Sequence, residues 1–233
     1  MKKKSNPIKE CLQYNISVEG ENCELLYFEH LKKLINECEK TKYKVNFFIR
    51  AKTPSSFAKS RISIYTQKGK KSEGYVKFFH VQDIEDYYDK EQLNKFKLII
   101  DDIEKAKKEC NISSYDLAYS NYTFDLWMIL HKYDLKTPVS NRFEYCTYIN
   151  KGYKTKYTKI DEYKAVAEFT KILSSITLDD VITAIKRGHV IHNNHINNKD
   201  HIETYKKFNF YRDNPDMTIH IIVEKILEEC KII

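Results

Sequence analysis

The chain has 233 residues, and 42% of them are hydrophobic. These values predict a globular protein with a sizeable core, and they exclude a disordered chain. Lys and Arg outnumber Asp and Glu by 40 − 33 = 7. This positive balance favours a polyanionic partner such as a nucleic acid, although a Lys-rich surface that serves only solubility would give the same balance.

Cysteine usage and the lack of long apolar segments indicate the compartment. The six cysteines form no Cys-x-x-Cys pair, which predicts reduced thiols of a cytoplasmic protein rather than a zinc site or a disulfide framework. The basic start, Met1 to Lys4, is followed by no apolar stretch, so we do not expect a signal peptide. No run approaches the ~20 apolar residues that a membrane-spanning helix needs, and we expect no membrane contact.

The predicted elements alternate between strand and helix in the first part of the chain. Strands are predicted at 13–19, 43–50, 75–82 and 116–120, and helices at about 23–39, from Thr53, at about 90–110 and at 122–133. This alternation predicts an α/β fold with a mainly parallel sheet and helices on both faces.

Beyond Pro138 the strand signal fades. Helices are predicted at 139–150, 161–175, 178–188 and 216–232. We therefore expect an α/β core over residues 1–138 and a helical extension over 139–233 that packs on the core. One continuous domain remains the alternative.

Glu19 stands where the first predicted strand ends. Tyr14, Ile16 and Val18 alternate with polar residues, and Gly20 then permits a sharp turn into the helix that follows. Ligands of open α/β sheets bind at the carboxyl ends of the strands, so Glu19 is a candidate site residue. Glu24 follows in the first turn of the helix. It is either a second metal ligand or a charge that the helix macrodipole favours there.

A second group of acids closes the strand predicted at 75–82. Asp83 and Glu85 are two residues apart, so both would point to one side of an extended chain, with Asp86 beside them as a neighbour of the ligands or a helix cap. If this strand lies parallel to the first and next to it, these acids meet Glu19 at one edge of the sheet. Carboxylates so close together repel each other strongly without a cation. Oxygen ligands suit Mg²⁺ or Mn²⁺, so Glu19, Glu24, Asp83 and Glu85 are the candidate metal ligands.

Three motifs together carry a family resemblance. They are Glu19-Gly20-Glu21-Asn22-Cys23-Glu24-Leu25-Leu26-Tyr27-Phe28, Ser120-Asn121-Tyr122-Thr123-Phe124-Asp125-Leu126-Trp127-Met128-Ile129-Leu130-His131 and Asn214-Pro215-Asp216-Met217-Thr218. In this order the chain resembles the RloB-like family, whose members carry the TOPRIM domain of topoisomerases, primases and OLD-type nucleases. The family usually has Asp where Glu85 stands and Glu where Asp125 stands, so the reach of both carboxylates differs by one methylene.

The resemblance implies a TOPRIM-like sheet, a metal-dependent activity and further site residues. Ser120, Asn121 and Asp125 would line the site, and His131 would join Glu19, Asp83 and Glu85 in catalysis as a proton-transfer residue. A surface acid and a helix-end histidine with satisfied hydrogen bonds are the alternatives for Asp125 and His131. The resemblance also implies a bacterial anti-phage abortive-infection system with a partner ATPase of the ABC or AAA kind.

Three basic segments are candidates for contact with a nucleic-acid backbone. They contain Lys70 and Lys71, Lys154 and Lys156, and Lys186 and Arg187. The segment 151–159 also interleaves tyrosines, which suits base stacking, although a loop whose tyrosines pack back on the protein is equally compatible.

The sequence thus predicts a metal-dependent nuclease that cleaves phosphodiester bonds in RNA, including tRNA, or in DNA, with Mg²⁺ or Mn²⁺ as cofactor. The alternative is a catalytically inactive subunit that binds nucleic acid or the ATPase. The oligomeric state stays open.

Overall fold

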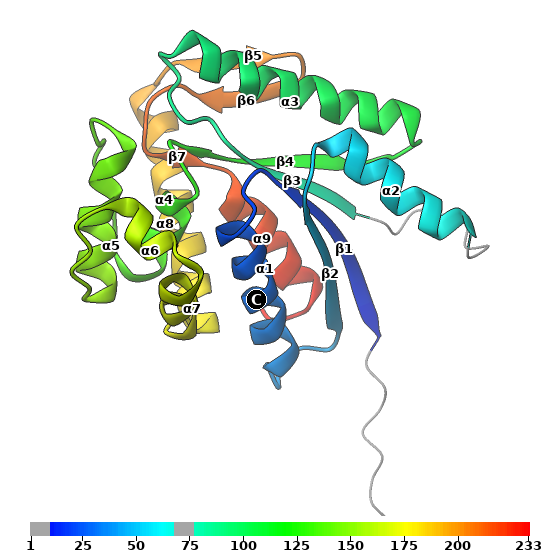
Figure 1. Cartoon of the computed structure of the whole chain (residues 1–233), viewed down its shortest axis with the longest axis horizontal. Helices are drawn as coiled ribbons and strands as arrows, with labels where there is room; N and C mark the ends of the chain where they lie inside the picture. Colours follow the sequence, from blue (N-terminus) through cyan, green and yellow to red (C-terminus); the bar gives the residue numbers. More distant parts are fainter. Residues whose placement is uncertain (1–9, 68–76) are drawn as a thin grey trace, which may run out of the picture.

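A computed structural model describes residues 10–67 and 77–233 (Figure 1). Its main sheet has the strand order β2-β1-β3-β4-β7. The first four strands, β1 (Cys11–Val18), β2 (Lys44–Ala51), β3 (Lys77–Asp83) and β4 (Tyr115–Asn121), pair in parallel, and β7 (Asp216–Met217) joins β4 antiparallel. The predicted α/β class with a mainly parallel sheet is confirmed. The predicted basic residues Lys70 and Lys71 lie outside the described residues.

Helices cover both faces of the sheet, because successive side chains of each strand point to opposite faces. On β3, Phe79 and Val81 join the larger hydrophobic cluster, whereas Phe78 joins the smaller one. The larger cluster packs under α1 (Cys23–Glu37), α4 (Asp125–Lys132) and α9 (Ile219–Glu229). The smaller one packs under α2 (Pro54–Gln67) and α3 (Lys90–Glu109).

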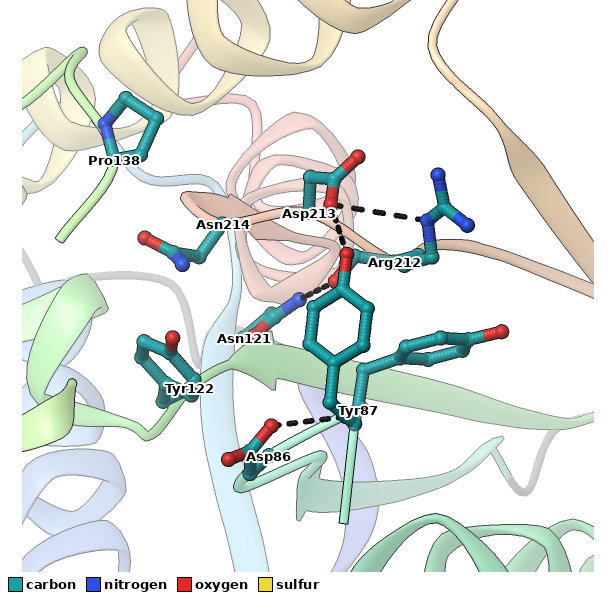
Figure 2. A pocket seen from close by; sticks show the side chains of 9 residues that line it. Asp86, Tyr87, Asn121, Tyr122, Pro138, Arg212, Asp213 and Asn214 are labelled. Carbon is teal, nitrogen blue, oxygen red and sulfur yellow. Dashed lines mark hydrogen bonds and ion pairs between the residues drawn. The ribbon is translucent and has the colours of Figure 1, made fainter. Parts of the chain in front are cut away.

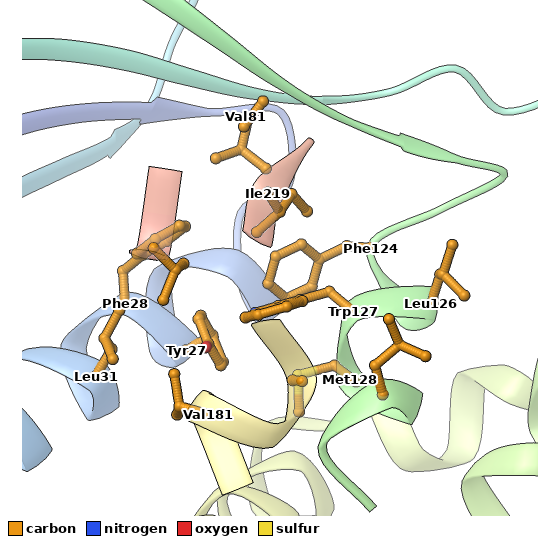
Figure 3. Close-up of a cluster of buried hydrophobic side chains, with 14 of the residues drawn as sticks. Tyr27, Phe28, Leu31, Val81, Phe124, Leu126, Trp127, Met128, Val181 and Ile219 are labelled. Atoms are coloured by element: carbon orange, nitrogen blue, oxygen red, sulfur yellow. The ribbon is translucent and has the colours of Figure 1, made fainter. Parts of the chain in front are cut away.

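The chain beyond residue 138 is mainly helical, as the sequence indicates. A 3₁₀ turn (Arg142–Glu144) precedes α5 (Tyr145–Tyr153), α6 (Ile160–Lys164), α7 (Val166–Ser174) and α8 (Leu178–Asn198). Thr177 and Asp180 form a capping box that fixes the start of α8. These helices share the larger cluster with the sheet: Figure 3 shows Tyr27 of α1, Trp127 of α4, Val181 of α8 and Ile219 of α9 packed together.

The structure adds short strands that the sequence patterns do not predict. A hairpin of β5 (Ile202–Tyr205) and β6 (Phe208–Tyr211) covers part of α3, where Phe210 enters the smaller cluster. The last helix begins at Ile219 rather than at 216, because residues 216–217 pair with β4 instead. Within the described ranges, no helix has the length and apolar character to cross a membrane.

Candidate functional site at the carboxyl edge of the sheet

Glu19 and Asp83 meet at the carboxyl edge because their strands are parallel neighbours. Val18 lies opposite Val81 in the register of β1 and β3. The backbone N–H of Glu19 continues this pairing by donating to the carbonyl of Val81 at 3.1 Å. The backbone N–H of Asp83 in turn donates to Oε2 of Glu19 at 3.1 Å. Although Glu19 stands at the surface, loss of water around its carboxylate raises its pKa.

The Asp83 carboxylate has few compensating interactions. Its Oδ1 is buried and has no hydrogen-bond partner among the described residues. Burial raises the pKa of Asp83 well above its ordinary value, and the charges of Glu24 and Glu19 raise it further. An ionised Asp83 therefore needs a positive charge that these acids do not provide.

Glu24 reaches the same place from the first turn of α1. It is buried, and burial followed by the charge of Asp125 raises its pKa to about 6. Its carboxylate lies against Gly20, where a Cβ would come within 2.7 Å of Cδ of Glu24. Glycine at position 20 thus lets the turn after β1 approach this carboxylate closely. Glu24 lies in a first helical turn and interacts electrostatically with Asp125 and Glu19, so both interpretations of Glu24 stay predictions.

Asp125 is the fourth acid, and its orientation is fixed by three donors. It is 2% exposed at the start of α4. Its Oδ2 accepts a hydrogen bond from Oγ1 of Thr123 at 2.8 Å and forms an ion pair with Nζ of Lys164 at 2.9 Å. The hydroxyl of Tyr163 donates to Oδ1. Burial acts to lower the pKa of Lys164, but the charge and hydrogen bond of Asp125 together with the charge of Asp83 outweigh it and raise that pKa to about 12.

Tyr163 and Lys164 belong to α6 and are site residues that sequence reasoning missed. The charge of Lys164 also acts on Asp83 and Glu24, where it lowers the pKa. One ammonium group therefore faces a group of four carboxylates. No motif or spacing marks Lys164, because it comes from a helix that is remote from the acids in sequence.

Glu85 corrects the expectation that Asp83 and Glu85 share one side of an extended chain. Glu85 adopts the left-handed conformation, with φ of 65°, so the chain is not extended there. Its Oε2 accepts an ion pair from Nη1 of Arg142 at 2.5 Å. Its charge still acts on Glu19, but a neighbouring arginine already partners it.

The residues around β4 have separate tasks. Ser120 lies opposite Asp83 in the β3–β4 register, and its buried Oγ has no hydrogen-bond partner in the described part of the chain. Nδ2 of Asn121 donates to the carbonyl of Arg212 at 2.8 Å. Asp86 caps a local turn, since its Oδ1 accepts from the N–H of Tyr88 at 2.9 Å.

The Asn-Pro-x-x-Thr motif is a structural clamp. Asn214 receives the N–H of Val139 at 2.8 Å and donates to the carbonyl of Val139 at 3.1 Å. The backbone N–H of Thr218 donates to the carbonyl of Tyr119 at 2.9 Å, and Oγ1 of Thr218 accepts the N–H of Tyr119 at 3.0 Å. The motif thereby ties the C-terminal part of the chain to β4 at Tyr119 and to the segment at Val139.

His131 lies in the core rather than among the acids. Its Nδ1 bonds the carbonyl of Trp127 at 2.8 Å, and its Nε2 bonds the hydroxyl of Tyr27 at 3.2 Å. Burial lowers the pKa of His131 to about 4, so the imidazole is neutral at neutral pH. The structure does not bring this side chain to the carboxylates, and its catalytic role stays a prediction from resemblance.

The basic candidates fall into two kinds. Lys154, Lys156 and Lys186 are exposed. Nη1 of Arg187, in contrast, donates to the carbonyl of Leu130 at 2.6 Å and so completes the end of α4. The tyrosines of segment 151–159 pack back on the protein: the hydroxyl of Tyr153 donates to the carbonyl of Met128 at 2.7 Å, and that of Tyr157 to Glu168 at 3.0 Å. Base stacking on this segment is thus disfavoured.

The carboxylate oxygens of these acids are suitable ligands for a hard divalent cation, but their present arrangement does not form a complete coordination site. In the described ranges, no group of three or more His, Cys, Asp and Glu side chains is placed to hold a metal ion. The donors are nonetheless all oxygens, and the buried Oδ1 of Asp83 has no partner there. Mg²⁺ and Mn²⁺ prefer such ligands.

A cavity of about 190 Å³ lies between the loop that follows β3 and the end of β4 and is lined by Asp86 and Asn121 among others. Figure 2 shows Tyr122 and Asn214 on one side of it, and the tyrosine ring that donates to Asp213 on the other. The loop after β3 joins the cavity to the site, since the N–H of Glu85 donates to the carbonyl of Tyr122 at 2.9 Å. A larger cavity, about 500 Å³, adjoins it and shares Pro138, Asp213 and Asn214.

Comparison with known proteins places the chain in one family. The sequence model of the RloB-like protein family matches residues 14–226. Comparisons with curated proteins and with solved structures found no match. The matched range contains all four carboxylates, the β4–α4 motif and the Asn-Pro-x-x-Thr clamp, and the chain therefore belongs to the RloB-like protein family.

Proposed function

We propose that this RloB-like protein is a metal-dependent nuclease of the TOPRIM type, which cleaves phosphodiester bonds in RNA, including tRNA, or in DNA. One observation carries the proposal: Glu19, Glu24, Asp83 and Asp125 gather at the carboxyl edge of the parallel sheet. The charge of Glu24 raises the pKa of Asp83 there, and the charge of Asp125 raises that of Glu24. Structural needs alone would not collect mutually repelling acids at the edge where such sheets bind ligands.

The residues divide the work as follows. Glu19, Glu24 and Asp83 would hold Mg²⁺ or Mn²⁺, which would supply Lewis-acid activation of water and charge neutralisation at the scissile phosphate. Asp125 is held by Thr123, Tyr163 and Lys164, so it would orient the ligands rather than move with them. Glu19 is the acid most open to solvent and has a raised pKa, which suits a group that exchanges a proton with the substrate.

The biological setting of the proposal rests on the family alone. The protein would act in the bacterial cytoplasm as the effector of an anti-phage abortive-infection system and would work with an ATPase of the ABC or AAA kind. The formal excess of seven positive charges suits a nucleic-acid partner.

The test compares cleavage by variants that differ in one carboxylate. Labelled RNA and DNA are incubated with the protein and Mg²⁺ or Mn²⁺, and Asp83→Asn is compared with Glu21→Gln. Glu21 is an exposed acid of the same turn region, so its variant controls for net charge. We expect Glu21→Gln to cleave as the unmodified protein does and Asp83→Asn to lose cleavage. Equal cleavage by both variants would refute the proposal.

A catalytically inactive subunit that binds nucleic acid or the ATPase is the second candidate. Two contacts favour it: Lys164 already places a positive charge beside the acids, and Arg142 pairs with Glu85. Calorimetric titration with Mn²⁺ separates the candidates. The nuclease should bind the ion and lose this binding in Asp83→Asn, whereas the inactive subunit should give no heat in either form.

A further inference from the structure

Two exposed aromatic rings flank the acidic edge. Among the described side chains, Tyr88 and Phe143 are the only aromatic residues that are more than half exposed, at 68% and 62%. Most aromatic side chains of this protein are buried or half-buried, as their apolar area demands. The positions of these two rings are therefore informative.

Both rings are tied to the loop that follows Asp83. The hydroxyl of Tyr88 donates to Oδ1 of Asp213 at 2.9 Å, which fixes that side chain at the mouth of the smaller cavity. Phe143 follows Arg142, whose guanidinium pairs with Glu85 and lies 5.3 Å from the Phe143 ring centroid. The two rings thus lie on separate elements that both meet the loop after Asp83, and Tyr88 lines the cavity.

The cavity itself has the lining that a planar heterocycle requires. Tyr88 and Tyr122 offer aromatic faces, Asp86 and Asp213 offer acceptors, and Arg212 offers donors. With about 190 Å³, it accommodates one small planar group and excludes a paired, stacked duplex. A base can enter such a cavity only when it is unpaired.

We propose that the nucleic acid binds this site as an unpaired strand, with one base in the cavity beside Tyr88 and a neighbouring base stacked on Phe143. The ligand class rests on the proposed function, but the geometry adds that the segment at the carboxylates is single-stranded. Because every base can stack on an aromatic ring, this binding mode would distinguish single-stranded from double-stranded nucleic acid and would not distinguish one base sequence from another.

The test measures binding without cleavage. All variants carry Asp83→Asn and are assayed in EDTA, so a failure of the nuclease proposal does not affect the readout. A fluorescently labelled oligonucleotide, as RNA and as DNA, is titrated by anisotropy at one fixed salt concentration, first as a single strand and then annealed to its complement. Tyr88→Leu and Phe143→Leu remove a ring, whereas Tyr88→Phe keeps the ring and removes only the bond to Asp213.

We expect the single strand to bind more tightly than the duplex, and each Leu variant to weaken single-strand binding by about fivefold or more. Tyr88→Phe keeps the ring but loses the bond that fixes it, so its affinity should lie between those of the parent and Tyr88→Leu. Equal affinity for both strand forms, or Leu variants without effect, would overturn the proposal. So would a loss in Tyr88→Phe as large as in Tyr88→Leu, because the hydroxyl rather than the ring would then matter. The absence of binding to any of the labelled oligonucleotides would overturn the proposal as well.

Discussion

Replacement of Glu24 by Gln should stabilise the metal-free protein. Gln keeps the size of the side chain and removes the charge that the surrounding acids oppose. Burial, followed by the charge of Asp125, raises the pKa of Glu24 from 4.5 to about 6. One pKa unit corresponds to about 1.4 kcal/mol, so the ionised carboxylate costs about 2 kcal/mol of folding free energy near neutral pH.

The pH dependence of this effect has a defined sign. Because the pKa is higher in the folded state, the folded protein binds more protons than the unfolded chain between about pH 4.5 and 6. The contribution of Glu24 to stability therefore falls as pH rises through this window and stays low above it. Glu24→Gln should gain its full benefit at about pH 7.5 and less than half of it at about pH 5.

Thermal unfolding in EDTA at both pH values measures the difference. About 2 kcal/mol corresponds to a rise of about 4–8 °C in Tm for a chain of this length. Glu21→Gln serves as the matched control, because Glu21 is exposed in the same region and should change Tm little at either pH. A lower Tm for Glu24→Gln at pH 7.5, or an equal gain at both pH values, would refute the reasoning.

Three further substitutions test the surrounding contacts. Lys164→Met leaves a buried carboxylate without its counter-ion and should cost about 1–3 kcal/mol in urea unfolding, less than a fully buried pair because Lys164 is 35% exposed. Asn214→Ala removes both hydrogen bonds to Val139 and should lower stability by about 1–3 kcal/mol, measured by thermal unfolding. Arg142→Ala breaks an exposed ion pair and should lower the free energy of unfolding in urea by less than about 1 kcal/mol, and added salt should shrink this difference because it screens the pair.

The sheet and part of the site follow from sequence patterns because those patterns are local. A period of two marks β1 and a short apolar run marks β3, and parallel pairing then forces their carboxyl ends to one edge. Glu19 and Asp83 could therefore be brought together before any coordinates. For Glu24 the sequence left two roles open, a metal ligand or a charge in the first helical turn, since the helix dipole also favours an acid there.

Other features depend on information that no short window contains. Glu85 does not lie on the same side of an extended chain as Asp83, because its backbone is left-handed, a conformation that glutamate rarely adopts. The β5–β6 hairpin turns at Lys206, whose backbone is also left-handed. A tight hairpin turn usually has Asn-Gly or Asp-Gly at this place, and because this chain has neither there, the sequence does not predict the hairpin. Lys164 reaches Asp125 only through the packing of α6.

The position of Lys164 bears on what the acids need. Four carboxylates share one edge, and two of them have pKa values that their neighbours raise, so the group has a deficit of positive charge. Lys164 supplies one charge and is bound to Asp125, which leaves Asp83 with a buried oxygen that accepts no hydrogen bond from the described residues. A proton on Glu24 or Asp83 can relieve part of the remainder, because the pKa of each carboxyl is raised. A bound cation would relieve it with both groups ionised, so metal binding at Asp83 is the quantity that separates a catalytic site from a merely acidic one.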